Sequence, residues 1–171
     1  MATKHHNISG ELTKELLAVG SGVNVKNISL ANIQRFSSVS VDLFIQKPLL
    51  GRFYFFKKLV IPAGVTYSYD TSFNNDSNGF GLFVKLTEAP TFLLTGSINV
   101  TGTNTNVPGT NTRFTSELTI GDEILVTGET RVIESITSDT VATVTAAWGS
   151  DLADDTSPDC NPIGLVDVII S

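Results

Sequence analysis

The sequence consists largely of short segments in which apolar and polar residues alternate, and this two-residue period limits most of the chain to β-structure. Successive side chains of a strand point to opposite faces, so such a segment turns one apolar face toward a core. The clearest example is SVSVDLFIQ, residues 38–46, in which Phe44 interrupts an otherwise polar face. The apolar face of this segment carries Val39, Val41, Leu43 and Ile45.

The same period predicts a series of further strands. A phase shift inside VNVKNISLANI predicts a bulge near Lys26–Asn27. Pro62 cannot donate to a ladder, so the strand before it should stop there or lie at a sheet edge. Residues 11–20 fit either a short helix or a first strand, whereas residues 71–79 and 102–110 have loop composition. The expected strands are 23–33, 38–46, 52–61, 65–70, 80–88, 123–126, 130–136, 140–148 and 165–171.

Composition restricts the function classes. Hydrophobic residues make up 41% of the chain and charged residues 16%, which is typical of a folded protein with a polar, weakly charged surface. The formal net charge of −6 would repel phosphate backbones, so no nucleic-acid partner is expected. With no apolar run long enough to span a bilayer, no membrane partner is expected, and the N-terminus lacks the apolar core of a secretory signal.

A change in amino-acid composition at Ala89–Pro90 indicates a second unit. Residues 95–117 are rich in Thr, Asn and Gly, and several short strands with tight turns follow, one turn at Thr127–Gly128 and one at Ser138–Asp139. The acidic stretch 151–162 has the composition of a return linker, and the final strand has the pattern to pair with the segment around Phe83. These features favour a small β domain inserted into a hairpin of a larger one, although two sequential domains are also compatible with the pattern.

The chemistry-bearing residues form no recognisable catalytic pattern. His5 and His6 are adjacent near the N-terminus, where a frayed or partner-bound arm is expected, and Cys160 is expected to be an inert thiol in the linker. The single cysteine excludes an intrachain disulfide and a cysteine-based zinc site, and no cofactor or metal is expected. The carboxylates Asp151, Asp154, Asp155 and Asp159 fit a solvated acidic loop. A hydrolase would need two converging carboxylates, for instance from Asp122, Glu123, Glu129 and Glu134, and their spacing does not indicate this.

The segment GRFYFFKK, residues 51–58, interleaves aromatic and basic side chains. Such segments occur on single-strand nucleic-acid platforms, but the bulky Tyr54 and Phe56 stand where that motif has small and branched residues. A strand with one face in the core and the other against a neighbouring subunit fits better, because contiguous exposed aromatics mark interfaces. The interface candidates are Phe53, Tyr54, Phe55, Phe56 and Trp148.

Two stretches of the chain resemble virion proteins of tailed bacteriophages. The first comprises NVKNISLANIQRFSSVSVDLFIQ, YFFKKLVIPAGVTYSYD and the closing LVDVIIS. It resembles a small phage β-sandwich family with a hydrophobic-x-IPAG corner, here residues 60–64, and a terminal strand of the V-x-V-I-I-S type. In simpler members of that family the terminal strand soon follows the strand corresponding to GLFVKL, so the resemblance implies an insertion here.

The second stretch, residues 109–148, is similar to a G-T-x-T-x-F-x-x-x-L-x-x-G-D-x-I module of phage tail, fibre, neck and capsid-associated proteins. The matching positions are Gly109, Thr110, Thr112, Phe114, Leu118, Gly121, Asp122 and Ile124. Neither resemblance supplies catalytic residues, so no enzymatic activity is expected.

Together these observations predict an all-β protein. An antiparallel β-sandwich of jelly-roll or Ig-like type would comprise residues 1–92 plus 160–171, and a small SH3-like or OB-like β-barrel would be inserted at 95–155. The resemblance implies a structural component of a phage virion that forms a symmetric homo-oligomer at the neck or tail or on the capsid surface. Its partners would be copies of itself and portal, neck, tail or major capsid proteins. The alternative is a glycan-binding module of a tail or capsid fibre, which would need a concave aromatic site using Trp148.

Overall fold

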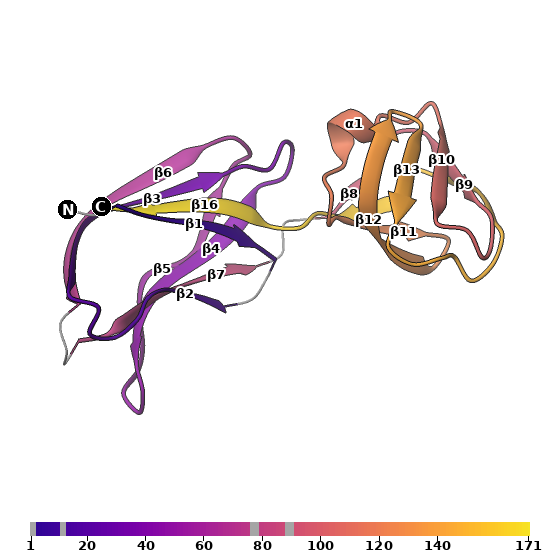
Figure 1. Cartoon of the computed structure of the whole chain (residues 1–171). Helices are drawn as coiled ribbons and strands as arrows, with labels where there is room; N and C mark the ends of the chain where they lie inside the picture. The colour runs from indigo at the N-terminus through magenta and orange to yellow at the C-terminus, as the bar shows by residue number, and fades with distance from the viewer. Residues whose placement is uncertain (1–2, 11–12, 76–78, 88–90) are drawn as a thin grey trace. The chain divides into compact units, whose positions relative to one another are not determined.

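The computed structural model describes residues 3–10, 13–75, 79–87 and 91–171, except for the side chains of 153–156. The chain divides into two compact units, Met1–Glu88 with Gly164–Ser171 and Ala89–Ile163. We call the first the sandwich and the second the insert. In the described residues both units consist of antiparallel strands, and the insert adds one short helix (Figure 1). The all-β class expected from the sequence is confirmed.

The sandwich contains two four-stranded antiparallel sheets. The first sheet has the order β1 (Lys4–Ser9), β16 (Leu165–Ile170), β3 (Val23–Asn32) and β6 (Thr66–Asn75). The second has the order β2 (Thr13–Leu17), β7 (Gly81–Thr87), β4 (Val39–Lys47) and β5 (Gly51–Ile61).

The path of the chain through these sheets is that of a jelly roll. Successive strands cross from one sheet to the other at every step except β4 to β5, which form a hairpin within the second sheet. Eight strands wound in this way form the double-sheet jelly roll, whereas an Ig-like sandwich divides its strands differently between the sheets. The insert occupies the connection from β7 to β16.

The strand β16 lies between β1 and β3, where Val168 faces His6 on one side and Leu30 on the other. The expected pairing of this strand with the segment around Phe83 is wrong, because β7 lies in the opposite sheet between β2 and β4. Alternation alone shows that a strand has one buried face, and it does not identify the neighbour to which the strand bonds.

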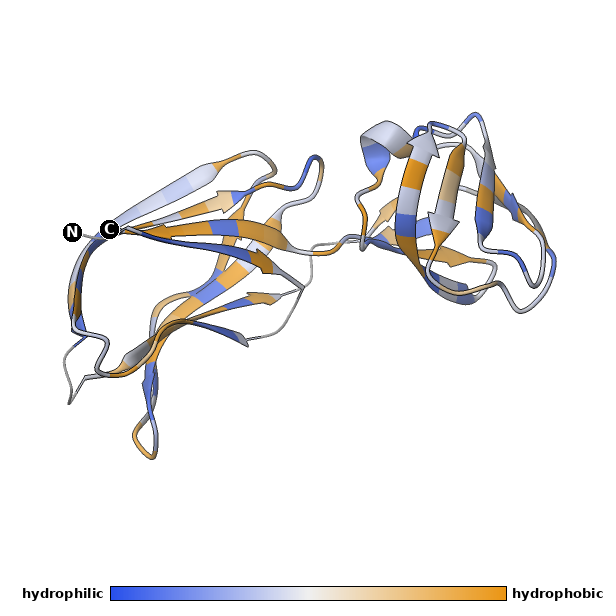
Figure 2. Ribbon diagram, in the orientation of Figure 1, coloured by the Kyte–Doolittle hydropathy of each residue, from blue (hydrophilic) through white to orange (hydrophobic). Residues whose placement is uncertain are grey.

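Alternating residues of both sheets form the sandwich core. Figure 2 shows apolar and polar positions along these strands. The bulge expected in β3 is present, with a register shift against β6 between Val25 and Asn27. The backbone N–H groups of Lys26 and Asn27 at this bulge both donate to the carbonyl oxygen of Ser171. Strand β5 ends at Ile61, directly before Pro62, and lies at the edge of its sheet, as expected.

The insert is a separate eight-stranded ladder around its own core. Its order is β14-β9-β10-β13-β12-β11-β15-β8. The strands are β8 (Phe92–Leu93), β9 (Ser97–Val100), β10 (Asn106–Thr110), β11 (Glu123–Val126), β12 (Glu129–Ser138), β13 (Val141–Val144), β14 (Leu152–Thr156) and β15 (Asp159–Asn161), and the helix is α1 (Phe114–Glu117). The pairings at the two ends of this order, β14 with β9 and β15 with β8, join the same two stretches of chain.

The two tight turns expected in the insert are present, whereas several segments expected to be loops form strands. Thr127 and Gly128 both have positive φ, of 45° and 89°, which suits a two-residue hairpin turn. The second expected turn joins β12 to β13. Four expectations are wrong: residues 71–75 extend β6, residues 106–110 form β10, the presumed linker contains β14 and β15, and His5 and His6 lie within β1.

The G-T-x-T-x-F-x-x-x-L-x-x-G-D-x-I module, residues 109–124, provides turns and core contacts in the insert. A Cβ at Gly109 would lie 2.1 Å from Oγ1 of Thr112, so only glycine fits there. That hydroxyl donates to the carbonyl oxygen of Asp139 at 2.6 Å, which ties the segment before α1 to the turn between β12 and β13. Phe114 is fully buried, and Asp122 accepts hydrogen bonds from the backbone N–H groups of Thr119 and Ile163.

Candidate interaction surface

The outer face of the β2-β7-β4-β5 sheet carries a row of aromatic rings. In the register of β4 with β7, Leu43 faces Val84 toward the core, so the next pair, Phe44 and Phe83, points outward. The two rings are stacked with centroids 5.7 Å apart, and Tyr54 of β5 packs on the other side of Phe44 at 5.3 Å. Phe44 is therefore completely buried although it lies outside the sandwich core.

Basic side chains cover and flank this row. The guanidinium of Arg52 lies 4.8 Å from the centre of the Phe44 ring, and Nζ of Lys57 lies 5.2 Å from that of Tyr54. Such placements allow cation–π attraction. Lys85 follows in the next row, opposite Asp42. We call this surface the aromatic–basic face; it comprises Phe44, Tyr54, Phe83, Arg52, Lys57 and Lys85.

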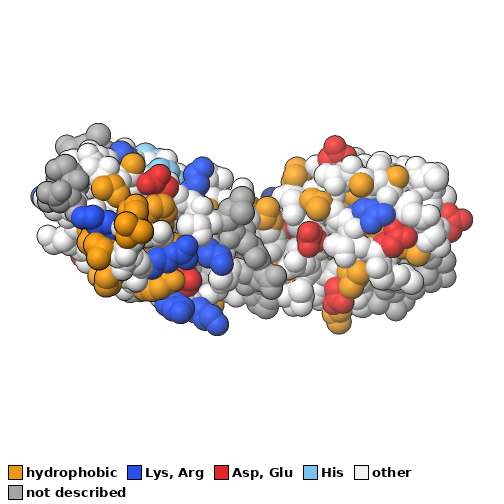
Figure 3. All heavy atoms as spheres, turned by 90° about the horizontal axis from the view of Figure 1, so that it is seen from below, with side chains coloured by type: hydrophobic (Ala, Val, Ile, Leu, Met, Phe, Trp, Pro, Cys, Tyr) orange, Lys and Arg blue, Asp and Glu red, His pale blue; other side chains and the backbone are white. Residues whose placement is uncertain are grey.

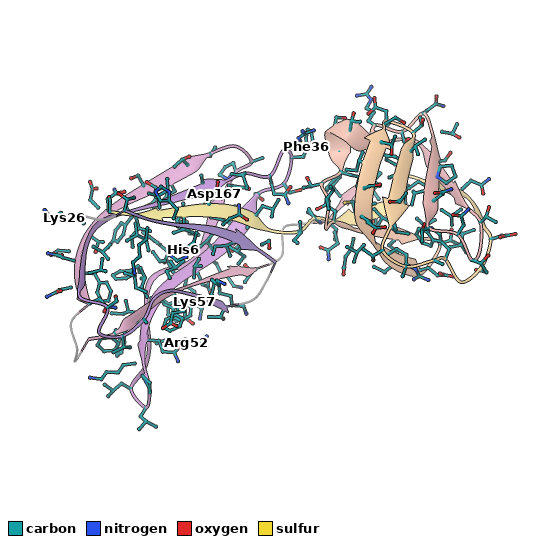
Figure 4. All side chains as sticks on the ribbon, viewed as in Figure 1. His6, Lys26, Phe36, Arg52, Lys57 and Asp167 are labelled. Atoms are coloured by element: carbon teal, nitrogen blue, oxygen red, sulfur yellow. The ribbon has the colours of Figure 1, made fainter. Side chains whose placement is uncertain are left out.

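The cations of the aromatic–basic face have no carboxylate partner within ion-pair distance in the described part of the chain. Nε of Arg52 donates to Gln46, and Oδ1 of Asp42 accepts the backbone N–H of Lys58 at 2.7 Å. The other carboxylate in these rows is Glu15, opposite Phe83. Figure 3 shows Lys and Arg side chains gathered among hydrophobic ones on the sandwich, and Figure 4 labels Arg52 and Lys57.

The four aromatic interface candidates of β5 divide into two groups. Phe53 and Tyr54 are exposed at 53% and 40%, so they offer surface to a partner. Phe55 and Phe56 are half-buried and pack against aromatic side chains of β6. The ring pairs are Phe55 with Tyr69 and Phe73, and Phe56 with Tyr67 and Tyr69. These pairs close the side of the sandwich between the edge strands of its two sheets.

The fifth candidate, Trp148, is buried in the insert core with 1% of its surface exposed. The guanidinium of Arg131 lies 5.3 Å from its ring and donates to the carboxylate of Glu129 at 2.8 Å. Trp148 therefore offers no ring surface to a sugar, which argues against the glycan-binding alternative. A hollow of about 280 Å³ in the insert is lined by Thr101, Asn104, Asn106, Pro108 and Val141, none of them aromatic.

The carboxylates considered for hydrolysis have separate structural surroundings. Asp122 is buried, and this burial raises the pKa of its carboxyl. The hydrogen bonds that the carboxylate accepts from the backbone N–H groups of Ile163 and Thr119 oppose this rise. The backbone N–H of Gly149, helped by the Ser150 hydroxyl and Arg131, lowers the pKa of Glu129. Glu123 and Glu134 are exposed.

The remaining reactive groups are also dispersed. Cys160 lies in β15 and is fully buried, which raises the pKa of its thiol far above the usual range. His5 points to solvent and His6 toward the sandwich interior, as expected for neighbours in a strand. Among the described residues, no group of three or more His, Cys, Asp or Glu side chains is placed to hold a metal ion, and no helix is long and apolar enough to cross a membrane. The side chains of Asp154 and Asp155 lie outside the described set.

Two buried asparagines were not singled out from the sequence. Nδ2 of Asn32 donates to the carbonyl oxygens of Ser37 and Ile61, both at 2.9 Å, and its Oδ1 accepts the N–H of Gln34. It thereby fixes the corner at residues 60–64, where the N–H of Gly64 donates to the carbonyl oxygen of Asn32. Asn75 links the Ser21 turn to the carbonyl oxygen of Phe80 in the same way. Polar residues at inward positions of a strand pattern are the available signal for such side chains.

Comparison with known proteins identifies no relative. No protein-family model matches the chain, and no curated protein or solved structure matches it.

Proposed function

We propose that the chain is a structural component of a tailed-phage virion that assembles with copies of itself into a symmetric oligomer at the neck or tail or on the capsid surface. The observation that carries the proposal is the strand order of the sandwich. Eight-stranded double-sheet jelly rolls recur in viral capsid domains. Because one fold serves many functions, the strand order supports the proposal only together with features of the surface.

The two sequence patterns that resemble phage proteins support the proposal, because their residues make specific turns and contacts in the structure. In the corner at 60–64, Gly64 has a φ of 69°, which favours glycine, and Asn32 braces the turn. In the module of the insert, Gly109 makes room for Thr112, and Asp122 ties a turn to the end of the unit. These patterns therefore correspond to specific packing requirements.

We also propose that the insert is a closed barrel of the small SH3-like or OB-like kind. Its ladder starts from the stretch that holds β8 and β9 and passes through β10, β13, β12 and β11 to the stretch that holds β14 and β15. That last stretch pairs with the first. Closure of this kind leaves no long unpaired sheet edge, which suits a domain displayed at high local concentration.

The aromatic–basic face supports a role in assembly. Exposed aromatics and arginine are enriched at protein interfaces. The sandwich would anchor the chain in a ring or lattice, and the insert would provide a second contact surface. The expected neighbours are further copies of the chain and portal, neck, tail or major capsid proteins.

Two measurements test the proposal. Mass spectrometry of purified phage particles that encode the chain should detect it at a fixed copy number relative to the major capsid protein. Cryo-EM of the same particles should show density for the jelly roll with cyclic or lattice symmetry. Absence of the chain from particles that carry their full set of other structural proteins would refute the proposal.

A further inference from the structure

The two units carry opposite net charge. Nine of the eleven Lys and Arg residues lie in the sandwich sequence, together with seven of the seventeen Asp and Glu residues. The insert contains the other two basic residues and the other ten acidic ones. The formal charges are therefore +2 for the sandwich and −8 for the insert. Separation of charge between two units of one chain favours contacts between unlike units of different copies.

On the sandwich, three basic residues lie on the aromatic–basic face. Arg52 and Lys57 lie over the rings of Phe44 and Tyr54, and Lys85 lies in the adjacent row. Among the described residues of these rows, the carboxylate of Asp42 accepts the backbone N–H of Lys58, and Glu15 is the other acidic side chain. A partner for this face needs carboxylates around an apolar centre.

The insert has a surface of that kind on β11, β15 and β8. Leu125 lies opposite Asp159, and Asp159 lies opposite Leu93 on the next strand. Leu93 and Leu125 are exposed at 64% and 36%, and Glu123 is exposed beside them on β11. We call Glu123, Leu125, Asp159 and Leu93 the acidic face. It places two carboxylates beside two exposed leucines.

We propose that the aromatic–basic face of one copy binds the acidic face of the insert of a second copy. The inference rests on the proposed function and specifies the interface that it requires. The two faces differ, so the contact is heterologous: repeated around an axis it closes into a ring, and without closure it extends as a filament. The leucines pack against Tyr54 and Phe83, while Glu123 and Asp159 approach Arg52, Lys57 and Lys85.

Charge exchange tests the inference with the full chain. Variant A carries Arg52→Glu and Lys57→Glu, and variant B carries Glu123→Lys and Asp159→Lys. Sedimentation velocity up to about 1 mM should show self-association of the wild type that weakens as salt rises from about 0.1 M to about 1 M. Each variant alone should associate about tenfold more weakly or worse, because one face of every contact is reversed. An equimolar mixture of A and B should associate again with the two variants alternating, because the unaltered acidic face of A fits the unaltered aromatic–basic face of B and the two reversed faces fit each other.

Two controls make the result specific. Lys26→Glu on β3 reverses an exposed charge in the other sheet of the sandwich, outside both faces, and should leave association unchanged. The neutral pair Arg52→Gln and Lys57→Gln should give an intermediate loss, and circular dichroism checks that each variant is folded.

Three results would overturn the inference, and they bear differently on the proposed function. If self-association is unchanged by salt and is equally strong in variants A and B, these two faces do not form the interface, while the proposal of homo-oligomeric assembly still holds. A wild type that stays monomeric in solution yet occurs in purified particles would exclude this interface and leave the virion role. Tight binding of a polyanion such as heparin to the wild type, lost in variant A and unaccompanied by self-association, would assign the face to a different partner.

Discussion

The rings of Phe44 and Phe83 stack with centroids 5.7 Å apart and an angle of 12° between their planes, on a sheet face that points away from the sandwich core. Phe44 is buried there by neighbours on its own sheet and needs no second layer to cover it. The sandwich thus has a small apolar cluster outside its core, and that cluster presents aromatic edges and cations to solvent.

This burial predicts a large stability effect at an outward position. Phe44→Ala should lower the free energy of unfolding of the sandwich by about 3 kcal/mol, the loss expected for a buried phenylalanine. Phe53→Ala, at an exposed ring of the neighbouring strand, should cost less than about 1 kcal/mol. All three tyrosines lie in the sandwich and the one tryptophan in the insert. Urea unfolding followed by tyrosine near-UV circular dichroism therefore reports the sandwich, and equal losses in both variants would contradict the prediction.

The bracing of the 60–64 corner predicts a second effect. Asn32→Ala should destabilise the sandwich by about 3 kcal/mol, because it leaves the buried carbonyl oxygens of Ser37 and Ile61 without their donor. Asn27 lies on the same strand, and its side-chain amide donates hydrogen bonds to Ser68 and Asp70 in an exposed position. Asn27→Ala should therefore cost less than about 1 kcal/mol. Tryptophan fluorescence of the insert should be unchanged in both variants, and a shift there would contradict a local role for Asn32.

The adjacent histidines predict a pH dependence carried by one of them. Burial, followed by the charges of Lys4, Lys14 and His5, lowers the pKa of His6 below its ordinary value, while a hydrogen bond to the Leu16 backbone opposes the shift. The unfolded chain then binds the proton more tightly than the folded chain. The stabilisation is complete above the unfolded pKa of about 6.5 and is lost as the pH falls through the lower folded pKa.

Matched substitutions isolate this effect. His6→Gln should flatten the decline in sandwich stability on acidification below about pH 6.5, whereas His5→Gln should keep it, because its side chain points to solvent. Melting temperatures across the acidic range provide the measurement. A decline that persists in His6→Gln would assign the dependence to other groups.

Cys160 predicts a kinetic signature of the folded insert. Its thiol is fully buried, and burial raises its pKa, so a thiol reagent should not label it at neutral pH until the insert unfolds. A Thr137→Cys variant adds an exposed thiol on β12 and should show one fast-reacting group beside the slow one. Rapid labelling of the wild type under native conditions would mean that the insert opens locally far more readily than its packing implies.

Strand positions were readable from the sequence where one face is buried without interruption. The alternation of Val39, Val41 and Leu43 identified β4, the phase shift located the β3 bulge, and Thr127–Gly128 identified a hairpin turn. The neighbour of β16 was not readable, because the same alternation fits any position with one buried face. The strand β10 was hidden because Pro108 and Gly109 are typical of loops, yet Gly109 is required by its contact with Thr112.

The interaction surface was readable only in part. The aromatic and basic composition of residues 51–58 identified β5 as unusual. It could not show that Phe55 and Phe56 turn toward β6 while Tyr54 joins Phe44 and Phe83, since register shifts between β4 and β5 change which residues share a face. The burial of Trp148 likewise depends on how the chain returns after β13, which residue spacing does not reveal.

The interior position of β16 has a consequence for biosynthesis. On the ribosome, β1 to β7 emerge first, but the slot between β1 and β3 stays vacant until the whole insert has been translated. All strands of the insert lie in one continuous stretch of chain, so the insert can complete its fold while the jelly roll still lacks β16. A nascent chain paused just before residue 164 would therefore expose an unpaired gap beside β3 that a neighbouring nascent chain, or a chaperone, could occupy.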